Sequence, residues 1–138
     1  MLHDRSKCNI QVAEDDDAIR ELVVVRLGFA GYNLYQAISG PEALSKLVAI
    51  KPHGLILDVG LPQLDGFGVL KAMNDRDIKV PTLMLTARHN SEDVSTAIGL
   101  GASDYLAKPF DNGDLLRRMD RLMAAASQPR AAEKVHFI

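Results

Sequence analysis

The sequence predicts an α/β fold in which helices cover both faces of a five-stranded parallel sheet. Strand and helix patterns alternate five times along 138 residues, with short loops between them. The runs Leu55–Leu57 and Leu83–Leu85 are continuously apolar and each precedes a polar residue, which is typical of central strands buried on both faces. Right-handed crossovers then bring the strands side by side in one doubly wound domain.

The first unit is a strand followed by a helix. Alternation around Ile10 and Val12 predicts a strand from Cys8 to Ala13, and helical spacing of apolar residues begins at Asp17 and stops at Gly31. The residues expected on the buried face of this helix are Ile19, Leu22, Val23, Leu27 and Ala30.

The second unit begins with a short strand from Asn33 to Ala37. A helix follows, with Ser39 as its cap, Pro41 in its first turn and Glu42 completing a capping box. The residues expected on its buried face are Leu44, Leu47 and Val48.

The third strand is the apolar run that ends at Asp58, after the break at residues 52–54. The carboxyl ends of central strands in open α/β sheets are where ligands collect, and the turn formed by Gly60, Leu61 and Pro62 exposes the Asp58 carboxylate. After Asp65-Gly66, a third helix carries the apolar residues Phe67, Leu70 and Met73.

The last two units follow the same pattern. A fourth strand is expected from Val80 to Thr86, and Ser91 is expected to cap a helix that ends at Gly99 and Gly101. Its expected buried residues are Val94, Ala97 and Ile98. A last strand from Asp104 to Ala107 precedes a helix that opens with Asp111 and Asp114 and buries Leu115, Met119, Leu122 and Met123.

Composition narrows the class of protein. Hydrophobic residues make up 47% of the chain and charged residues 25%, as in ordinary soluble domains, and the net charge of -2 favours neither nucleic acid nor an anionic membrane as a partner. A single cysteine, Cys8, cannot form an internal disulfide, and no apolar run has membrane-spanning length. We therefore expect a cytoplasmic protein.

Polar residues directly follow four of the five strands. Because the ends of parallel strands meet at one edge of a sheet, these residues should converge; they are Glu14, Asp15, Asp16, Asp58, Thr86 and Lys108. Two carboxylates about 4 Å apart repel by about 4 kcal/mol at an effective dielectric near 20, so either protonation or a cation must relieve the repulsion. An oxygen-rich set without cysteine or histidine suits Mg²⁺ best, with Mn²⁺ as a substitute.

The same residue types suit the handling of a phosphoryl group. A metal ion and the Lys108 ammonium would neutralise phosphoryl oxygens, and the Thr86 hydroxyl would donate a hydrogen bond to one of them. The carboxylate at the centre, Asp58, could then act as the nucleophile and form an acyl phosphate.

Four motifs, in this order, resemble the response-regulator receiver domain of two-component signalling. They are Glu14-Asp15-Asp16, Asp58 through Gly66, Leu85-Thr86-Ala87-Arg88 and Gly101 through Phe110, and the resemblance extends from about Asn9 to Ala126. It implies a flavodoxin-like sheet of strand order 2-1-3-4-5 flanked by five helices.

The resemblance also implies a role for each site residue. Asp58 would accept phosphate from a sensor histidine kinase or a histidine phosphotransfer protein. Asp15, Asp58 and the backbone carbonyl of Gly60 would bind Mg²⁺ directly, and Glu14 would act through water. Lys108 would pair with Asp58 and then with the phosphate. The pair expected to act as the switch is Thr86 and Tyr105, and the peptide bond expected to be cis is Lys108-Pro109.

Two departures from the family pattern bear on function. Gly60 is small where many relatives carry a larger side chain, so water should reach the acyl phosphate more freely. Val94 stands where the relatives that dimerise through the fourth and fifth helices place a basic residue, although Asp104, Asp114 and Arg118 could still pair. The resemblance thus leaves open a phosphorylation-dependent homodimer or a downstream protein target.

The expected organisation is an N-terminal extension over residues 1–8, a receiver domain over residues 9–126 and a tail or linker over residues 127–138, with no DNA-binding segment in this chain. Such a domain catalyses its own phosphorylation and dephosphorylation but turns over no free substrate. The alternatives are a phosphohydrolase with an aspartyl-phosphate intermediate, disfavoured because Gly60 occupies the place of its second acid, and a flavodoxin-like binding module, whose flavin phosphate the acidic residues would repel.

Overall fold

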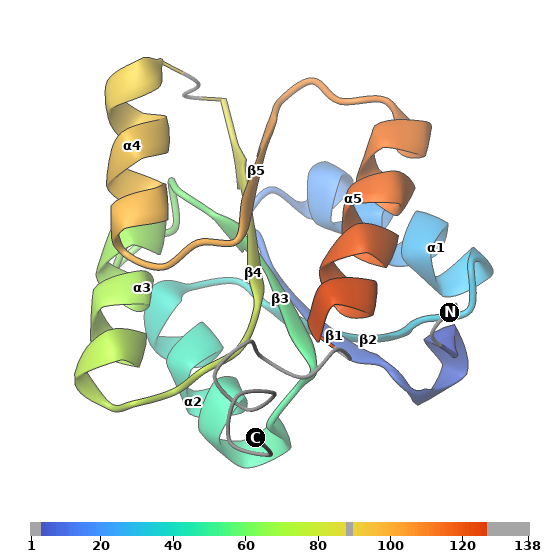
Figure 1. Cartoon of the computed structure of the whole chain (residues 1–138), viewed down its shortest axis with the longest axis horizontal. Coiled ribbons are helices and arrows are strands. Elements are labelled where there is room, and N and C mark those ends of the chain that lie inside the picture. Colours follow the sequence, from blue (N-terminus) through green and yellow to red (C-terminus); the bar gives the residue numbers. More distant parts are fainter. Residues whose placement is uncertain (1–3, 88–89, 127–138) are drawn as a thin grey trace, which may run out of the picture.

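The computed structural model of the chain describes residues 4–87 and 90–126, and it contains the predicted five-stranded parallel sheet. The strand order is β2-β1-β3-β4-β5, and a helix follows each strand, so the predicted fold class is confirmed (Figure 1). The strands are β1 (Asn9–Ala13), β2 (Asn33–Ala37), β3 (Gly54–Asp58), β4 (Thr82–Thr86) and β5 (Asp104–Ala107). The helices are η1 (Arg5–Lys7), α1 (Asp17–Phe29), α2 (Gly40–Ile50), α3 (Gly66–Asp75), α4 (Ser91–Gly99) and α5 (Asn112–Ala126).

The sheet divides the apolar interior into two layers. Helices α2, α3 and α4 cover one face, and α1 and α5 cover the other (Figure 1). All residues of the central strands β3 and β4 are buried, as expected for strands with a helical layer on each side. Among the described residues, no helix is both long enough and apolar enough to cross a membrane.

The strand register aligns the carboxyl ends of the strands at one edge of the sheet. Ala13 of β1 lies opposite Leu57 of β3, Asp58 lies opposite Leu85 of β4, and Thr86 lies opposite Ala107 of β5. Each of these strands therefore stops within a residue of its neighbour, and the polar residues that follow lie on one common edge.

Several element starts differ from those predicted. Asn90, and not Ser91, caps α4, because its side chain accepts a hydrogen bond from the amide of Asp93. Strand β4 begins at Thr82 rather than Val80, since Pro81 has no amide hydrogen to donate to a ladder. The capping of α2 by Ser39 is confirmed by its hydrogen bond from the Glu42 amide.

Three residues expected on buried helix faces are instead exposed. Leu22, Val48 and Ile98 are 39%, 55% and 49% exposed, respectively. In α4 the buried residues are Asp93 and Ala97, whereas Ile98 is exposed. The side-chain amide of Asn90 donates a hydrogen bond to the Asp93 carboxylate. The apolar spacing was compatible with more than one rotation of each helix, and packing against the sheet selected one of them.

A short turn before β1 is joined to the last helix. The Arg5 guanidinium of η1 donates to both carboxylate oxygens of Asp120 in α5, at 3.0 and 2.6 Å. The buried Tyr32 hydroxyl donates to the same carboxylate at 2.5 Å, and Arg5 also donates to the carbonyl of Ala30. Part of the predicted N-terminal extension is thus packed on the domain, while its residues 1–3 and the predicted tail, residues 127–138, lie outside the described residues.

We expect Tyr32→Phe to destabilise the protein by about 1–2 kcal/mol, because it removes one donor from the partly buried Asp120 carboxylate. Urea denaturation measures the change, and Tyr35→Phe on the edge strand is the matched control, expected to change stability by less than about 0.5 kcal/mol. Equal effects of the two substitutions would show that the Tyr32 hydroxyl contributes nothing specific.

Candidate functional site

The loop after β1 carries two of the acidic side chains. The Glu14 amide donates to the carbonyl of Ala37 in β2, which extends the strand pairing by one residue, and the Glu14 side chain is 1% exposed. Asp16 has extended backbone and caps α1 by accepting from the Ile19 amide. Asp15, between them, is exposed at the edge of the sheet. The loop therefore holds one carboxylate inward and presents the next to solvent.

Asp58 is the last residue of β3 and is only 6% exposed, so the prediction that the following turn exposes its carboxylate is wrong. The turn after it is closed by a 2.8 Å hydrogen bond from the Gly66 amide to the Val59 carbonyl. A side chain on Gly66 would place its Cβ 2.5 Å from the Asp58 carbonyl oxygen, so glycine is required for this close approach. A Cβ on Gly60 would lie 3.6 Å from Asp58 Oδ2, an ordinary van der Waals contact, so the backbone here can accept a side chain.

Lys108 joins the two buried carboxylates. Its ammonium lies 2.5 Å from Glu14 Oε1 and 3.1 Å from Asp58 Oδ1. The Lys108 amide donates to the Thr86 carbonyl at 2.7 Å, which continues the β4–β5 pairing up to the site. The following Lys108-Pro109 peptide bond is cis, as predicted.

The pKa values of these groups reflect burial and their mutual charges. Burial raises the pKa of Glu14, and the nearby Asp58 charge raises it further, while the hydrogen bond from Lys108 acts in the opposite direction without cancelling the rise. Burial lowers the pKa of Lys108, but its bonds to Glu14 and Asp58 outweigh that effect and leave it raised. Lys108 is therefore a permanent cation at neutral pH.

The three carboxylates predicted to hold a metal ion are brought together. Oxygen atoms of Glu14, Asp15 and Asp58 all lie within 4.8 Å of one another. Lys108 supplies one positive charge against three carboxyl groups, and the donor set contains only oxygen. These residues fit Mg²⁺, which is bound in proteins through a few carboxylates and retains several water molecules.

Thr86 and Tyr105 lie on the two strands next to this cluster. Thr86 ends β4 and is 1% exposed. Tyr105 lies opposite Met84 in β5, and its ring packs against the core on the α2–α4 side with its hydroxyl oxygen buried. Thr86 is therefore fully buried, whereas Tyr105 is half-buried on the neighbouring strand.

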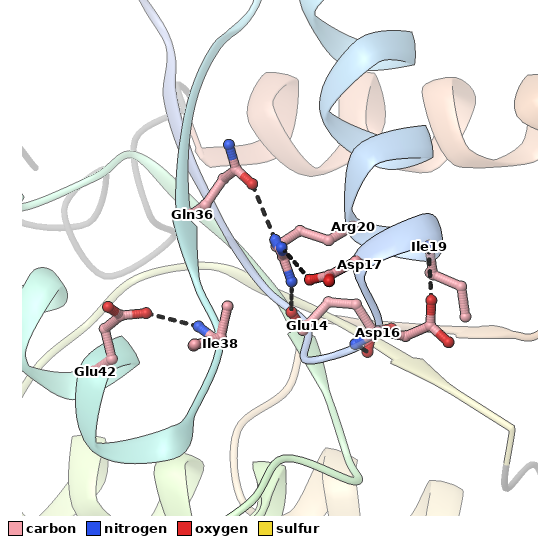
Figure 2. Close-up of polar contacts among 8 residues, drawn as sticks. All are labelled: Glu14, Asp16, Asp17, Ile19, Arg20, Gln36, Ile38 and Glu42. Carbon is pink, nitrogen blue, oxygen red and sulfur yellow. Dashed lines mark hydrogen bonds and ion pairs between the residues drawn. The ribbon is translucent and has the colours of Figure 1, made fainter.

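Sequence reasoning overlooked Arg20, which lies on α1 beside the acidic loop. Figure 2 shows its guanidinium between the carbonyl of Glu14, the carboxylate of Asp17 and the side-chain amide of Gln36. The available signal was local, since Asp17 and Arg20 are three residues apart on a helix and so share a face. The contact with Gln36 depends on how β2 pairs with β1.

A family model and curated relatives relate the sequence to response regulators. The family model described as the response regulator receiver domain matches residues 10–120. The response regulator MprA of Mycobacterium tuberculosis is 38% identical over 126 residues, covering 91% of this chain and 55% of MprA. The DNA-binding dual master transcriptional regulator RpaA of Synechocystis is 37% identical over 127 residues, covering 90% of this chain and 53% of RpaA. The chain thus spans about half the length of the curated relatives it matches.

Two solved structures share the fold with this chain over nearly their whole length. The chemotaxis protein CheY4 of Vibrio cholerae has a TM-score of 0.78 and 32% identity, covering 83% of this chain and 98% of that protein. The receiver domain of Francisella response regulator 1452 has a TM-score of 0.84 and 27% identity, covering 88% of this chain and all of that domain.

The raised pKa of Glu14 predicts a pH dependence of stability. Between the ordinary pKa of 4.5 and the raised value, the folded chain binds more protons than the unfolded chain, so stability falls as the pH rises through this window. In the absence of divalent cations, we expect Glu14→Gln to remove this fall, as measured by urea denaturation at a series of pH values. The exposed Glu21→Gln should retain it, and parallel curves for the unsubstituted protein and Glu14→Gln would contradict the prediction.

Proposed function

The chain belongs to the response regulator receiver domain family, and on that premise we propose that it is a phosphorylation-controlled switch in which Asp58 accepts a phosphoryl group. The donor would be the phosphohistidine of a sensor histidine kinase or of a histidine phosphotransfer protein. The observation that supports this most directly is the contact of one partly buried ammonium, Lys108, with both Asp58 and Glu14 beside a third carboxylate.

The proposed chemistry is a transfer between two nucleophiles. A carboxylate oxygen of Asp58 attacks the phosphorus, the P–N bond of the phosphohistidine breaks, and the imidazole retains the electron pair of that bond. Lys108, already 3.1 Å from Asp58 Oδ1, compensates the charge of the adduct. Attack by water later cleaves the O–P bond and returns the carboxylate and inorganic phosphate. The chain thus assists its own phosphorylation and dephosphorylation, and it does not turn over a free substrate.

Mg²⁺ supplies neutralisation of the phosphoryl oxygens when it is bound. Asp15, Asp58 and the backbone carbonyl of Gly60 would hold it, with Glu14 acting through water, and Mn²⁺ would substitute. The carboxylate cluster supports this assignment for Glu14, Asp15 and Asp58, and Gly60 lies two residues after Asp58 in the turn that follows β3.

The proposed output is a change in the face formed by α4, β5 and α5. The Thr86 hydroxyl would bond to the phosphoryl group, and Tyr105 would occupy the space that Thr86 leaves. Arg118 of α5 bonds to Asp104 of β5 at 2.7 Å, so this face already contains an ion pair that a partner could rearrange. Its partner would be a downstream protein or, after phosphorylation, a second copy of the chain.

Two further parts of the proposal rest on composition. With a net charge of -2, this chain would make no direct contact with nucleic acid, in contrast to the full-length relative described as DNA-binding. The protein would act in the cytoplasm. A phosphohydrolase remains disfavoured because Gly60 offers no acid two residues after Asp58.

We expect phosphoramidate with Mg²⁺ to add one phosphate to the protein and Asp58→Asn to abolish this addition. Intact mass spectrometry measures the product. The matched control is Asp75→Asn at the exposed end of α3, which should be phosphorylated like the unsubstituted protein. An unmodified protein, or a phosphate gained by Asp58→Asn, would rule out the proposed site.

We also expect Gly60→Met to prolong the phosphorylated state by several-fold, because its side chain would lie next to Asp58 Oδ2 and exclude water from the acyl phosphate. The decay of the phosphorylated mass with time, after removal of the phosphodonor, measures the lifetime. Equal lifetimes with methionine and glycine would show that water access at this position does not limit hydrolysis.

A further inference from the structure

Arg20 connects three elements next to the carboxylate cluster. Its guanidinium donates to the backbone carbonyl of Glu14 at 2.9 Å, to the carboxylate of Asp17 at 2.6 Å and to the side-chain carbonyl of Gln36 at 2.9 Å (Figure 2). The Arg20 side chain is only 15% exposed, and none of these bonds involves a side-chain oxygen of the cluster. Its bond to the loop is thus made through the backbone.

We propose that Arg20 is a positioning residue for the metal site, an inference that rests on the proposed function. The peptide group between Glu14 and Asp15 is planar, so fixing the Glu14 carbonyl oxygen also fixes the amide at which Asp15 begins. Arg20 thereby sets the direction in which the exposed Asp15 carboxylate leaves the loop, while Lys108 holds the Glu14 carboxylate.

Gln36 anchors the Arg20 guanidinium to the β-sheet. It lies in β2, where its backbone is in register with Val12 of β1, and the Lys46 ammonium donates to its carbonyl oxygen. The bond from Arg20 Nε to Gln36 therefore ties the orientation of the guanidinium to the sheet rather than to the helix alone. The planar guanidinium of arginine has donors in several directions and can satisfy three acceptors at once. The ammonium of lysine sits on a flexible stem and does not hold three acceptors in a fixed geometry.

Charge and position predict opposite effects of removing Arg20. Loss of a nearby positive charge would by itself strengthen binding of a cation to the acidic cluster. Loss of positioning would weaken it, and residues that orient metal ligands typically contribute 10- to 100-fold in affinity. The sign of the change in Mg²⁺ affinity therefore separates the two roles.

We expect Arg20→Met to weaken Mg²⁺ binding about 10-fold, as measured by isothermal titration calorimetry with Mg²⁺ alone. Arg20→Lys, which keeps the charge, should fail to restore affinity fully because it cannot satisfy all three acceptors. Gln36→Leu, which leaves Arg20 and its bond to Glu14 in place, should weaken binding by a smaller factor than Arg20→Met does. The matched control is Arg26→Met on the same helix, expected to stay within about 2-fold because Arg26 is exposed and lies away from the cluster.

Thermal unfolding without Mg²⁺ shows whether each variant is folded, and Gln36→Leu provides the test if Arg20→Met is not. If the Mg²⁺ affinity of Arg20→Met is unchanged or increased, the positioning role is overturned and the proposed function is unaffected. The same result for Gln36→Leu has the same meaning where Arg20→Met does not fold. An unsubstituted protein that binds no Mg²⁺ would instead refute the proposed function itself. If Arg20→Met lowers the stability equally with and without Mg²⁺ and leaves the Mg²⁺ affinity constant, Arg20 has only a structural role.

Discussion

An excess of negative charge at one edge of the sheet is the constraint on which the site depends. Glu14, Asp15 and Asp58 place carboxylate oxygens within 4.8 Å of one another, and Lys108 offers a single ammonium to two of them. Because Glu14 and Asp58 are buried, water screens their repulsion weakly, and the raised pKa of Glu14 reflects both its burial and this repulsion. A cation held among these carboxylates would therefore lower the energy of the site.

The rest of the fold maintains this unfavourable arrangement. Two apolar layers cover β3 on both faces, so the strand that carries Asp58 cannot shift without exposing the core. The turn after Asp58 is closed by Gly66, and the loop after β1 is fixed by the cap at Asp16 and by Arg20. A site that is strained by charge is thus carried on rigid elements, which is the usual relation between a functional site and its scaffold.

Sequence patterns were least reliable where several placements satisfied the same spacing. Ile98 was predicted to be buried, but α4 is rotated so that Ala97 and Asp93 face inward. Asn90 caps that helix although Ser91 has an equally suitable side chain, because capping requires extended backbone at the cap residue. Both differences arise from backbone geometry and packing, which residue type alone does not specify.

Local sequence patterns were sufficient to predict the alternation of strands and helices, the buried character of the strand before Asp58, and the residue types that meet at its end. Those features depend on local periodicity and on the rule that parallel strands end together. Two sets of contacts became apparent only in the folded domain: Lys108 contacts Glu14 as well as Asp58, and Arg20 bonds to both Glu14 and Gln36. Contacts between residues far apart in the chain depend on strand register and side-chain direction, and these are set by the packing of the whole domain.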